Sequence, residues 1–432
     1  MTPQSSFMVL APIVPSREKE LRALLASMNE GPGRVNATNA LIPFAKFENL
    51  HFARLIILDD KTTGDVRVYG LHPKQYPLYL AFLGDMDGDE NSFLEDLVKV
   101  AANGLRKIFS CCEKFGADTD ILNWMKERRK PSIANYVNTR GRTVRRIREE
   151  ATLYEVVESY IQKNSSLWNL APREVHAKLK QFVDAEKASG RLTLSPARPT
   201  PFGWWIRNLL HLLGVPLLVL VLSPLLIVIA PFYIVRLRML EKTDPEVCPT
   251  VDQGYGEELS GGEDHYVSNQ FSAMGSLKPG LLRLLTAIGV LGTVDYAARH
   301  IVRPGRLGRI RTIHFARWVF LDGTKRMIFC SNYDGSVETY RDDFINKTGF
   351  GINATFGGAV GFPRTNWIVL DGCQDEPKYV EYHRRHTMPT QVWYKAYPGL
   401  TAVDLERNER IRKGLEISSL NNQEASEWLA LL

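Results

Sequence analysis

The sequence predicts an α+β protein in which one unit occurs twice, with an apolar helical segment between the two copies. Residues 51–54 read His-Phe-Ala-Arg and recur as residues 314–317, and a Leu-Asp pair follows each copy at the same distance. Between the copies, residues 212–235 contain no charged side chain. A chain of 432 residues can form two cores of ordinary size, so two domains are expected.

The composition is that of a globular protein with a small excess of positive charge. Its 54 basic and 48 acidic residues give a formal charge of +6, which suits an anionic membrane surface as well as nucleic acid. The five cysteines form neither a paired framework nor a C-x-x-C motif, which favours a reducing compartment. Zinc, P-loop, dinucleotide and triad motifs are absent, and the N-terminal residues are expected to form a first strand and not a secretory signal.

Further matches extend the repeat over the full length of each copy. They are Phe7, Pro15 and Leu21 with Phe271, Pro279 and Leu285; Asp87, Gly88, Phe93 and Asp96 with Asp334, Gly335, Tyr340 and Asp343; and Tyr136, Gly141 and Thr143 with Tyr394, Gly399 and Thr401. The register changes once, around a longer predicted hairpin at residues 61–77. Chance is therefore a poor explanation of the matches.

Within the first copy, segments with the apolar pattern of a strand and segments with that of a helix follow one another in a definite order. The predicted elements are a strand at 7–14, a helix at 18–28, strands at 52–58 and 79–83, a helix at 87–101 and a strand at 133–137. The order β-α-β-β-α-β is the ferredoxin-like split motif.

The second copy repeats this order. Its predicted elements are a strand at 270–274, a helix at 281–298, strands at 314–321 and 327–331, a helix at 337–345 and a strand at 391–397. The whole pattern resembles the dimeric α/β-barrel superfamily, in which two ferredoxin-like units form one barrel. The resemblance covers most of residues 5–157 and 265–415, and it implies a pseudo-dimeric α/β barrel within one chain.

The domain organisation follows from the repeat and from the apolar segment. We expect a first ferredoxin-like repeat at 1–160 and a second at 265–415. The remaining segments are a helical linker at 161–203, a membrane segment at 204–240, a loop at 241–264 and a C-terminal tail at 416–432.

The apolar segment is long enough to cross a hydrocarbon core, which takes roughly 20 residues, and no polar stripe marks it as a core helix. Two repeats that close one barrel must lie on the same side of the bilayer. We therefore expect a helical hairpin, bent at Pro216, Pro224 or Pro231, or an in-plane monotopic anchor. The flanking charges, Arg207 before the segment and Arg236, Arg238 and Lys242 after it, place both repeats on the cytoplasmic side, with Trp204, Trp205, Phe232 and Tyr233 at headgroup level.

The repeated His-Phe-Ala-Arg strand supplies the first candidate site residues, His51 and Arg54 with His314 and Arg317. Alternation along a strand places His and Ala on one face and Phe and Arg on the other, so the His and the Arg should not meet the same small ligand. The histidines are either core residues or ligands or bases. The arginines either carry chemistry or pair with a carboxylate such as Asp96 or Asp343, Asp87 or Asp334.

Asp87 and Asp334 each precede a glycine at a strand-to-helix junction, where an N-capping Asp belongs. Residues 84–88, Gly-Asp-Met-Asp-Gly, are also similar to the G-x-x-D-G pattern of dye-decolorizing peroxidases, members of the same superfamily. That resemblance implies a catalytic Asp beside a haem, and His383 or His386 would then be the axial ligand. The second copy lacks the first glycine of the pattern.

Two further segments carry no firm assignment. The glycine-rich run 349–361 follows a predicted helix and is either a substrate-access loop or a flexible insertion. The basic segment 140–148 either contacts phosphate or lipid headgroups or forms a solvated helix face.

Two functions remain open. The first is a membrane-associated protein that binds an apolar or amphiphilic small molecule in its barrel, as a peroxidase-like or monooxygenase-like oxidoreductase by the family resemblance. The second is a non-catalytic membrane scaffold or assembly protein, which the equal retention of the motifs in both copies favours. The expected partners are membrane lipid and the amphiphile, and no nucleic acid.

Overall fold

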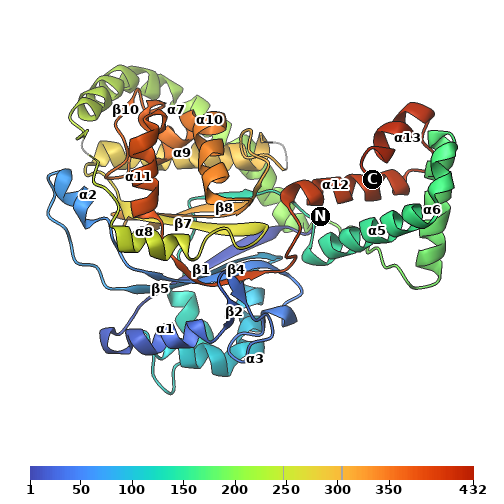
Figure 1. Cartoon of the computed structure of the whole chain (residues 1–432). Coiled ribbons are helices and arrows are strands. Elements are labelled where there is room, and N and C mark those ends of the chain that lie inside the picture. The colour runs from blue at the N-terminus through green and yellow to red at the C-terminus, as the bar shows by residue number, and fades with distance from the viewer. Residues whose placement is uncertain (247, 303–304) are drawn as a thin grey trace.

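The computed structural model describes residues 1–246, 248–302 and 305–432, and in these residues two four-stranded antiparallel sheets face each other (Figure 1). The first sheet has the order β1 (Gln4–Pro12), β5 (Tyr79–Asp87), β4 (Leu50–Leu58), β12 (Thr390–Lys395). The second has the order β6 (Ala134–Val137), β8 (Ile313–Leu321), β9 (Arg326–Asp334), β7 (Ser268–Ser276). Short hairpins form from β2 (Asn29–Gly31) with β3 (Arg34–Val35) and from β10 (Thr365–Asn366) with β11 (Leu370–Asp371).

Each sheet takes its fourth strand from the other half of the chain. Strand β12 pairs with β4, with Trp393 opposite Arg54, and β6 pairs with β8, with Asn135 opposite Arg317. The strand expected at residues 133–137 therefore forms, but it does not complete the sheet of its own half. Alternation of apolar and polar residues identifies a strand but not the strand with which it pairs. Because β4 and β8 carry the same His-Phe-Ala-Arg motif, the sequence gives no reason to prefer one of them as the partner of β6.

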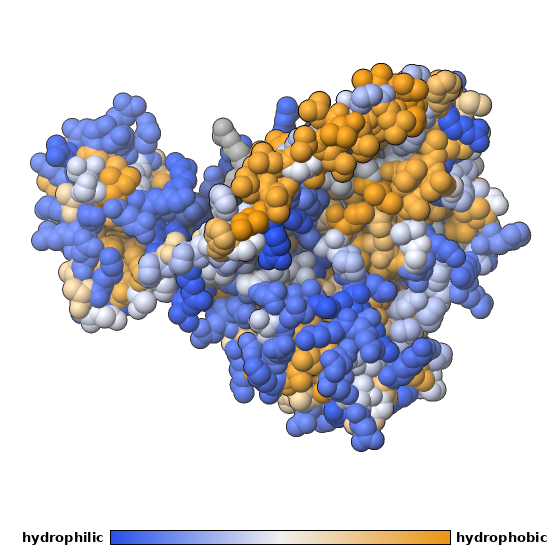
Figure 2. All heavy atoms as spheres, turned by 180° about the vertical axis from the view of Figure 1, so that it is seen from behind, coloured by the Kyte–Doolittle hydropathy of each residue, from blue (hydrophilic) through white to orange (hydrophobic). Residues whose placement is uncertain are grey.

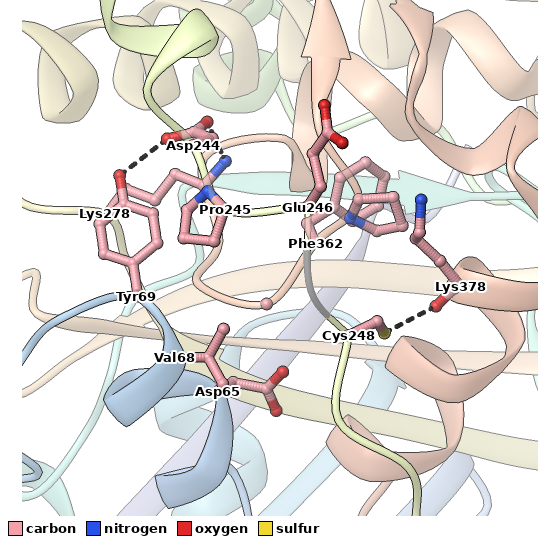
Figure 3. A pocket seen from close by; sticks show the side chains of 12 residues that line it. Asp65, Val68, Tyr69, Asp244, Pro245, Glu246, Cys248, Lys278, Phe362 and Lys378 are labelled. Atoms are coloured by element: carbon pink, nitrogen blue, oxygen red, sulfur yellow. Dashed lines mark hydrogen bonds and ion pairs between the residues drawn. The ribbon is translucent and has the colours of Figure 1, made fainter.

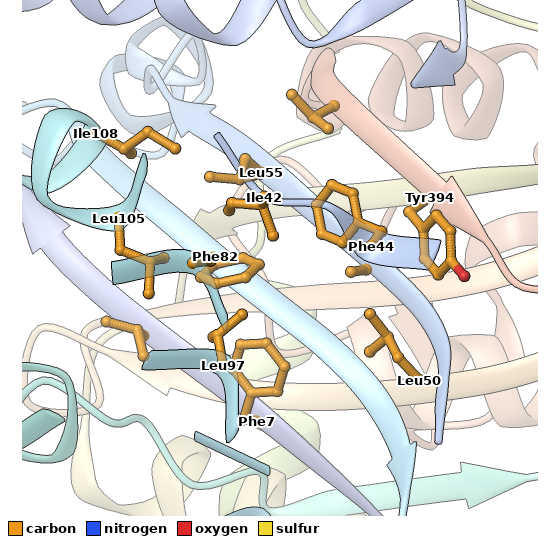
Figure 4. Close-up of a cluster of buried hydrophobic side chains, with 14 of the residues drawn as sticks. Phe7, Ile42, Phe44, Leu50, Leu55, Phe82, Leu97, Leu105, Ile108 and Tyr394 are labelled. Atoms are coloured by element: carbon orange, nitrogen blue, oxygen red, sulfur yellow. The ribbon is translucent and has the colours of Figure 1, made fainter. Parts of the chain in front are cut away.

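Helices cover the outer face of each sheet (Figure 1). Those on the first sheet are α1 (Glu18–Ala26), α3 (Glu90–Phe109) and α4 (Ile121–Glu127), and those on the second are α9 (Leu281–His300), α10 (Val337–Phe356) and α11 (Glu376–His386). Figure 4 shows the first core, where Phe7 and Phe82 of the sheet meet Leu97 and Leu105 of α3. The apolar face expected for the helix at 87–101 is therefore the face of α3 that packs on the first sheet.

A second apolar layer fills the space between the two sheets. Its members are Met8, Leu10, Ile56, Leu58, Ala81, Leu83, Met274, Val319, Leu321, Ile328, Cys330 and Met388. The sheet edges also meet through side chains, because Thr390 Oγ1 on β12 donates to Gln270 Oε1 on β7. The space between the two sheets is therefore filled with side chains.

A helical bundle projects from the sheets, on the right of Figure 1. It consists of α5 (Val144–Lys163), α6 (Pro172–Ala188), α12 (Ala402–Glu416) and α13 (Asn422–Leu429). Leu153, Leu179, Ile411 and Trp428, one from each helix, lie in its common core. The residues expected to be a linker and a tail thus pack together as parts of one bundle.

The remaining elements connect these layers. They are the helices α2 (Thr63–Val68) and α8 (Gln253–Ser260) and the 3₁₀ helices η1 (Pro15–Arg17), η2 (Phe44–Lys46), η3 (Ser165–Asn169) and η4 (Gly372–Gln374). The expected hairpin at 61–77 thus contains α2, and the expected loop at 241–264 contains α8. The glycine-rich run is helical as far as Phe356, because α10 continues through it after a kink at Thr348, so the expected loop begins only after that helix.

The apolar segment forms one continuous helix, α7 (Phe202–Lys242), with all three prolines inside it. The expected helical hairpin is therefore wrong, because a proline can kink a helix without reversing it. Helix α7 lies along α9: the Tyr296 hydroxyl donates to the Leu212 carbonyl at 3.0 Å, and the Tyr233 hydroxyl contacts Thr286. Within the described residues these two helices are long and apolar enough to span a membrane, and none of the apolar window of α7 is buried.

Candidate functional site

The repeated histidines are buried and bound to the repeated aspartates. His51 lies at a bulge in β4, where its Nε2 is 2.9 Å from Asp87 Oδ1 and its Nδ1 is 3.0 Å from the Tyr397 hydroxyl. His314 lies at the matching bulge in β8, with Nε2 2.7 Å from Asp334 Oδ1. Both imidazoles are at most 1% exposed.

The second oxygen of each aspartate binds a helix of the bundle. Asp87 Oδ2 accepts from the Val144 amide at 2.9 Å, at the start of α5, and Asp334 Oδ2 accepts from the Ala402 amide at 2.6 Å, at the start of α12. A carboxylate at a helix N-terminus accepts a hydrogen bond from a free amide and interacts favourably with the positive end of the helix dipole. Each aspartate thus joins a bulged strand to the bundle.

The expected capping of the following helices by Asp87 and Asp334 is wrong. Asp89 caps α3 and Ser336 caps α10, two residues further along in each case. Gly88 and Gly335, with φ of 90° and 87°, turn the chain between the aspartate and the true cap. Each aspartate is therefore directed back across the sheet, where both of its oxygens accept hydrogen bonds.

The repeated arginines reach from one sheet into the other. Arg54 Nη1 donates to the Phe271 carbonyl and to Ser272 Oγ, both at 2.9 Å, and its Nη2 donates to the Ser331 carbonyl at 2.8 Å. Burial lowers the pKa of Arg54 to about 10, so the guanidinium stays charged at neutral pH.

Arg317 makes the reciprocal contacts with β1 and β5. Its Nη1 donates to the Phe7 carbonyl at 2.7 Å, and its Nη2 donates to the Gly84 carbonyl at 3.0 Å and pairs with Asp85. The expected ion pairs of the arginines with Asp96, Asp343, Asp87 or Asp334 are wrong. The reason is that the arginines point between the sheets, away from the outer helices.

His383 and His386 lie on α11 in the core behind the second sheet. The His383 ring stacks on Phe271 with centroids 4.5 Å apart, and neither of its nitrogens has a hydrogen-bond partner among the described residues. Burial, together with the nearby charge of Arg341, lowers the pKa of His383 to about 3. His386 Nδ1 donates to the Met274 carbonyl at 3.1 Å.

These surroundings do not fit a haem. An axial ligand needs space for the macrocycle beside its nitrogen, but His383 is only 4% exposed and His386 only 1% exposed. The cavity of about 510 Å³ described below has no histidine in its lining. No group of three or more His, Cys, Asp and Glu residues in the described ranges could hold a metal ion.

A buried charge cluster fixes the C-terminal end of α7 to the rest of the protein (Figure 3). Lys278 Nζ donates to Asp244 Oδ2 at 2.6 Å, Arg283 Nη2 donates to Asp244 Oδ1 at 2.6 Å, and the Tyr69 hydroxyl donates to Asp244 Oδ1 at 2.9 Å. Burial lowers the pKa of Lys278, and Asp244 opposes that effect. The adjacent cavity of about 20 Å³ has room for one water, so this cluster is structural.

A much larger cavity lies at the other end of α7. It has a volume of about 510 Å³ and lies between the edges of β1 and β6, the first turns of α7 and the end of α9. Its lining includes Tyr136, Arg140, Trp204, Arg207 and Arg299. From the sequence, Arg140 is identified as part of a basic segment and Arg207 as a residue that flanks the apolar segment. Arg299, which lies on α9 in the other half of the chain and belongs to no motif, is not identified.

Comparison with known protein families, with curated proteins and with solved structures found no match for this chain. The chain is a mixed α/β protein with antiparallel sheets, and it carries one long apolar helix on its surface.

Proposed function

We propose that this chain is a non-catalytic scaffold that lies on a membrane, with α7 and α9 in the plane of one leaflet and the sheets and bundle on the cytoplasmic side. The observation that carries the proposal is the exposure of α7, a helix of 41 residues whose apolar window has no buried residue. The largest apolar patch of a soluble monomer rarely exceeds a few hundred Å². A lipid surface is the environment that removes such a helix from water.

The apolar surface extends beyond α7. Figure 2 shows it as a continuous hydrophobic ridge across one face of the molecule. On α9, Leu281 is 72% exposed and Leu285 is 53% exposed. Two adjacent helices with outward apolar side chains support an arrangement parallel to the membrane plane.

Both ends of α7 are attached to the same body, which supports an anchor that does not cross the bilayer. At the N-terminal side His211 Nδ1 is 2.8 Å from His300 Nε2, and at the C-terminal side Arg283 donates to the Leu240 carbonyl at 3.0 Å. Arg236 and Lys242 at the end of α7 are exposed, as expected of charged residues that flank an apolar anchor and do not enter it.

We further propose that the body consists of two ferredoxin-like units that have exchanged their last strands. The equivalent places of β1, β5 and β4 in the first sheet and of β7, β9 and β8 in the second support this proposal. So do the matching contacts of His51 with Asp87 and of His314 with Asp334. Because these residues are used in both copies to join elements, they support a scaffold more than an enzyme. The peroxidase-like and monooxygenase-like activities stay predictions of the family resemblance, and a Soret band in the purified protein would favour them.

The test is flotation of the purified full chain with phosphatidylcholine vesicles. The wild-type protein should float with the vesicles, and a variant with Leu217→Asp and Leu220→Asp, two exposed positions in the middle of α7, should remain unbound. The control is Val100→Asp, an exposed apolar position on α3, which should float like the wild type. The proposal would be overturned if the wild-type chain stays soluble without detergent and does not float with the vesicles.

A further inference from the structure

We propose that the cavity at the N-terminal end of α7 binds the phosphate-bearing headgroup of an anionic lipid. The inference rests on the proposed function, because it takes α7 to lie at the membrane surface. The volume of about 510 Å³ is within the range of small-molecule sites, roughly 300–1,000 Å³.

The lining carries a concentration of positive charge that has few internal partners. Arg140 and Arg207 form no ion pair with a carboxylate in the part of the chain that the structure describes, whereas Arg299 pairs with Asp295 at 2.7 Å. The acidic residue in the lining, Asp85, is already bound to Arg317. An anion in this cavity would therefore meet a surplus of guanidinium groups, which are well suited to phosphate oxygens.

The position of Arg140 is fixed before any ligand arrives. Its Nη1 donates to the Arg299 carbonyl at 2.5 Å, and this bond links the segment after β6 to the end of α9. Burial lowers the pKa of Arg140, and the positive charge of Arg299 contributes to that effect. A bound anion would compensate both of these costs.

The lining also includes a tyrosine whose hydroxyl is buried. Tyr136 is 1% exposed, and its hydroxyl has no hydrogen-bond partner in residues 1–246, 248–302 and 305–432. Buried polar groups are nearly always hydrogen-bonded, so this unsatisfied hydroxyl on a residue that lines the cavity is a spare donor for a ligand that reaches it. A phosphate oxygen is such an acceptor.

The location of the cavity favours an amphiphile over a free anion. Trp204 and Arg207 in the lining belong to α7 itself, and the uncharged segment begins at residue 212, little more than one helical turn after Arg207. A headgroup in the cavity would therefore have its acyl chains beside the apolar ridge of Figure 2. Tryptophan is enriched at this depth of a bilayer.

The experiment compares flotation with vesicles of phosphatidylcholine alone and with vesicles that also contain phosphatidic acid. The wild-type chain should prefer the anionic vesicles by about ten- to thirtyfold. The variant Arg140→Gln with Arg207→Gln should lose this preference and keep its binding to phosphatidylcholine. The matched control, Arg236→Gln with Lys242→Gln, removes the same charge from the other end of α7 and should keep most of the preference. Tyr136→Phe, which keeps the packing of the ring, should reduce the preference about fivefold.

The outcomes separate the two proposals. Failure of the wild type to bind phosphatidylcholine contradicts the membrane scaffold, whereas binding to phosphatidylcholine without a preference for phosphatidic acid contradicts only the headgroup site. If the variant with Arg140→Gln and the variant with Arg236→Gln lose the preference equally, the headgroup site is overturned. The preference would then come from diffuse electrostatic attraction between the protein and the anionic surface, and high salt should abolish it. Saturable binding of glycerol phosphate or inorganic phosphate, with the same affinity as the lipid, would assign the cavity to a soluble anion and overturn the lipid assignment.

Discussion

At the scale of single residues, a few buried polar side chains decide which elements are joined. Asp87 and Asp334 each bind a histidine of a bulged strand and the first amide of a bundle helix. Charge-assisted bonds of this kind are stronger than neutral ones, and removal of one partner leaves buried groups unsatisfied. The aspartates are therefore expected to contribute to folding and not to a reaction.

Asp87→Ala should lower the free energy of unfolding by about 2–4 kcal/mol, because it leaves His51 and the Val144 amide without their acceptor. Asp334→Ala should have an effect of similar size. The matched control is Asp89→Ala, which removes the exposed cap of α3 and should cost about 1 kcal/mol. Urea unfolding measures all three, and an Asp87 variant no less stable than the Asp89 variant would contradict the structural role.

His383 should make the protein sensitive to acid. Its pKa of about 3 in the folded protein lies below the ordinary value of 6.5, so between these two values the unfolded chain binds more protons. The contribution of His383 to stability is complete above about pH 6.5, and it declines as the pH falls toward about 3.

His383→Phe removes this titration and keeps the contact with the Phe271 ring. Relative to this variant, the wild-type protein should lose on the order of a few kcal/mol of stability between about pH 7 and about pH 4.5. Urea unfolding at both pH values tests it. Parallel losses in the two proteins would show that His383 is not the group that titrates.

At the scale of elements, the exchange of β6 and β12 makes each half of the chain dependent on the other. Without β12 the central strand β4 becomes an edge, and without the second sheet Arg54 loses the carbonyls of Phe271 and Ser331. An exposed strand edge promotes association, and a buried guanidinium without partners is costly.

Residues 1–200 expressed alone should therefore aggregate or form oligomers, whereas coexpression with residues 201–432 should restore a soluble one-to-one complex in detergent. Size-exclusion chromatography distinguishes these outcomes. A full-length chain cut by a protease between 189 and 201, after α6, is the control, because its halves have already exchanged strands and should stay together. A monomeric first half with native circular dichroism would contradict the dependence.

The type of most elements could be predicted from the sequence, because period and composition are local properties. The pairing of residues 133–137 could not, since both central strands carry the same motif. The helical character of residues 349–356 was hidden by glycines that favour loops in isolation, and here tertiary packing holds the helix. For the cavity, Arg140 and Arg207 were visible as basic residues, but only the fold brings Arg299 beside them.

At the scale of the whole molecule, the length of α7 separates an in-plane anchor from a crossing one. A helix of 41 residues is about 60 Å long, and the hydrocarbon core of a bilayer is about 30 Å thick. Contacts with α9 near both ends of the apolar segment hold the helix against the body. The whole apolar side of the molecule is therefore expected to enter one leaflet.

Cysteine labelling can test this orientation, because Cys111, Cys112, Cys330 and Cys373 are buried and Cys248 is only partly exposed. Phe202→Cys and Lys242→Cys place exposed thiols at the two ends of α7. In sealed vesicles to which the protein has bound from outside, a membrane-impermeant maleimide should label both ends to the same extent. Leu220→Cys, in the middle of the helix, should react only after detergent is added, and the unmodified chain gives the background from Cys248. If one end stays protected until the vesicles are lysed, α7 crosses the bilayer, and the contacts that hold it along α9 must then be broken in the membrane.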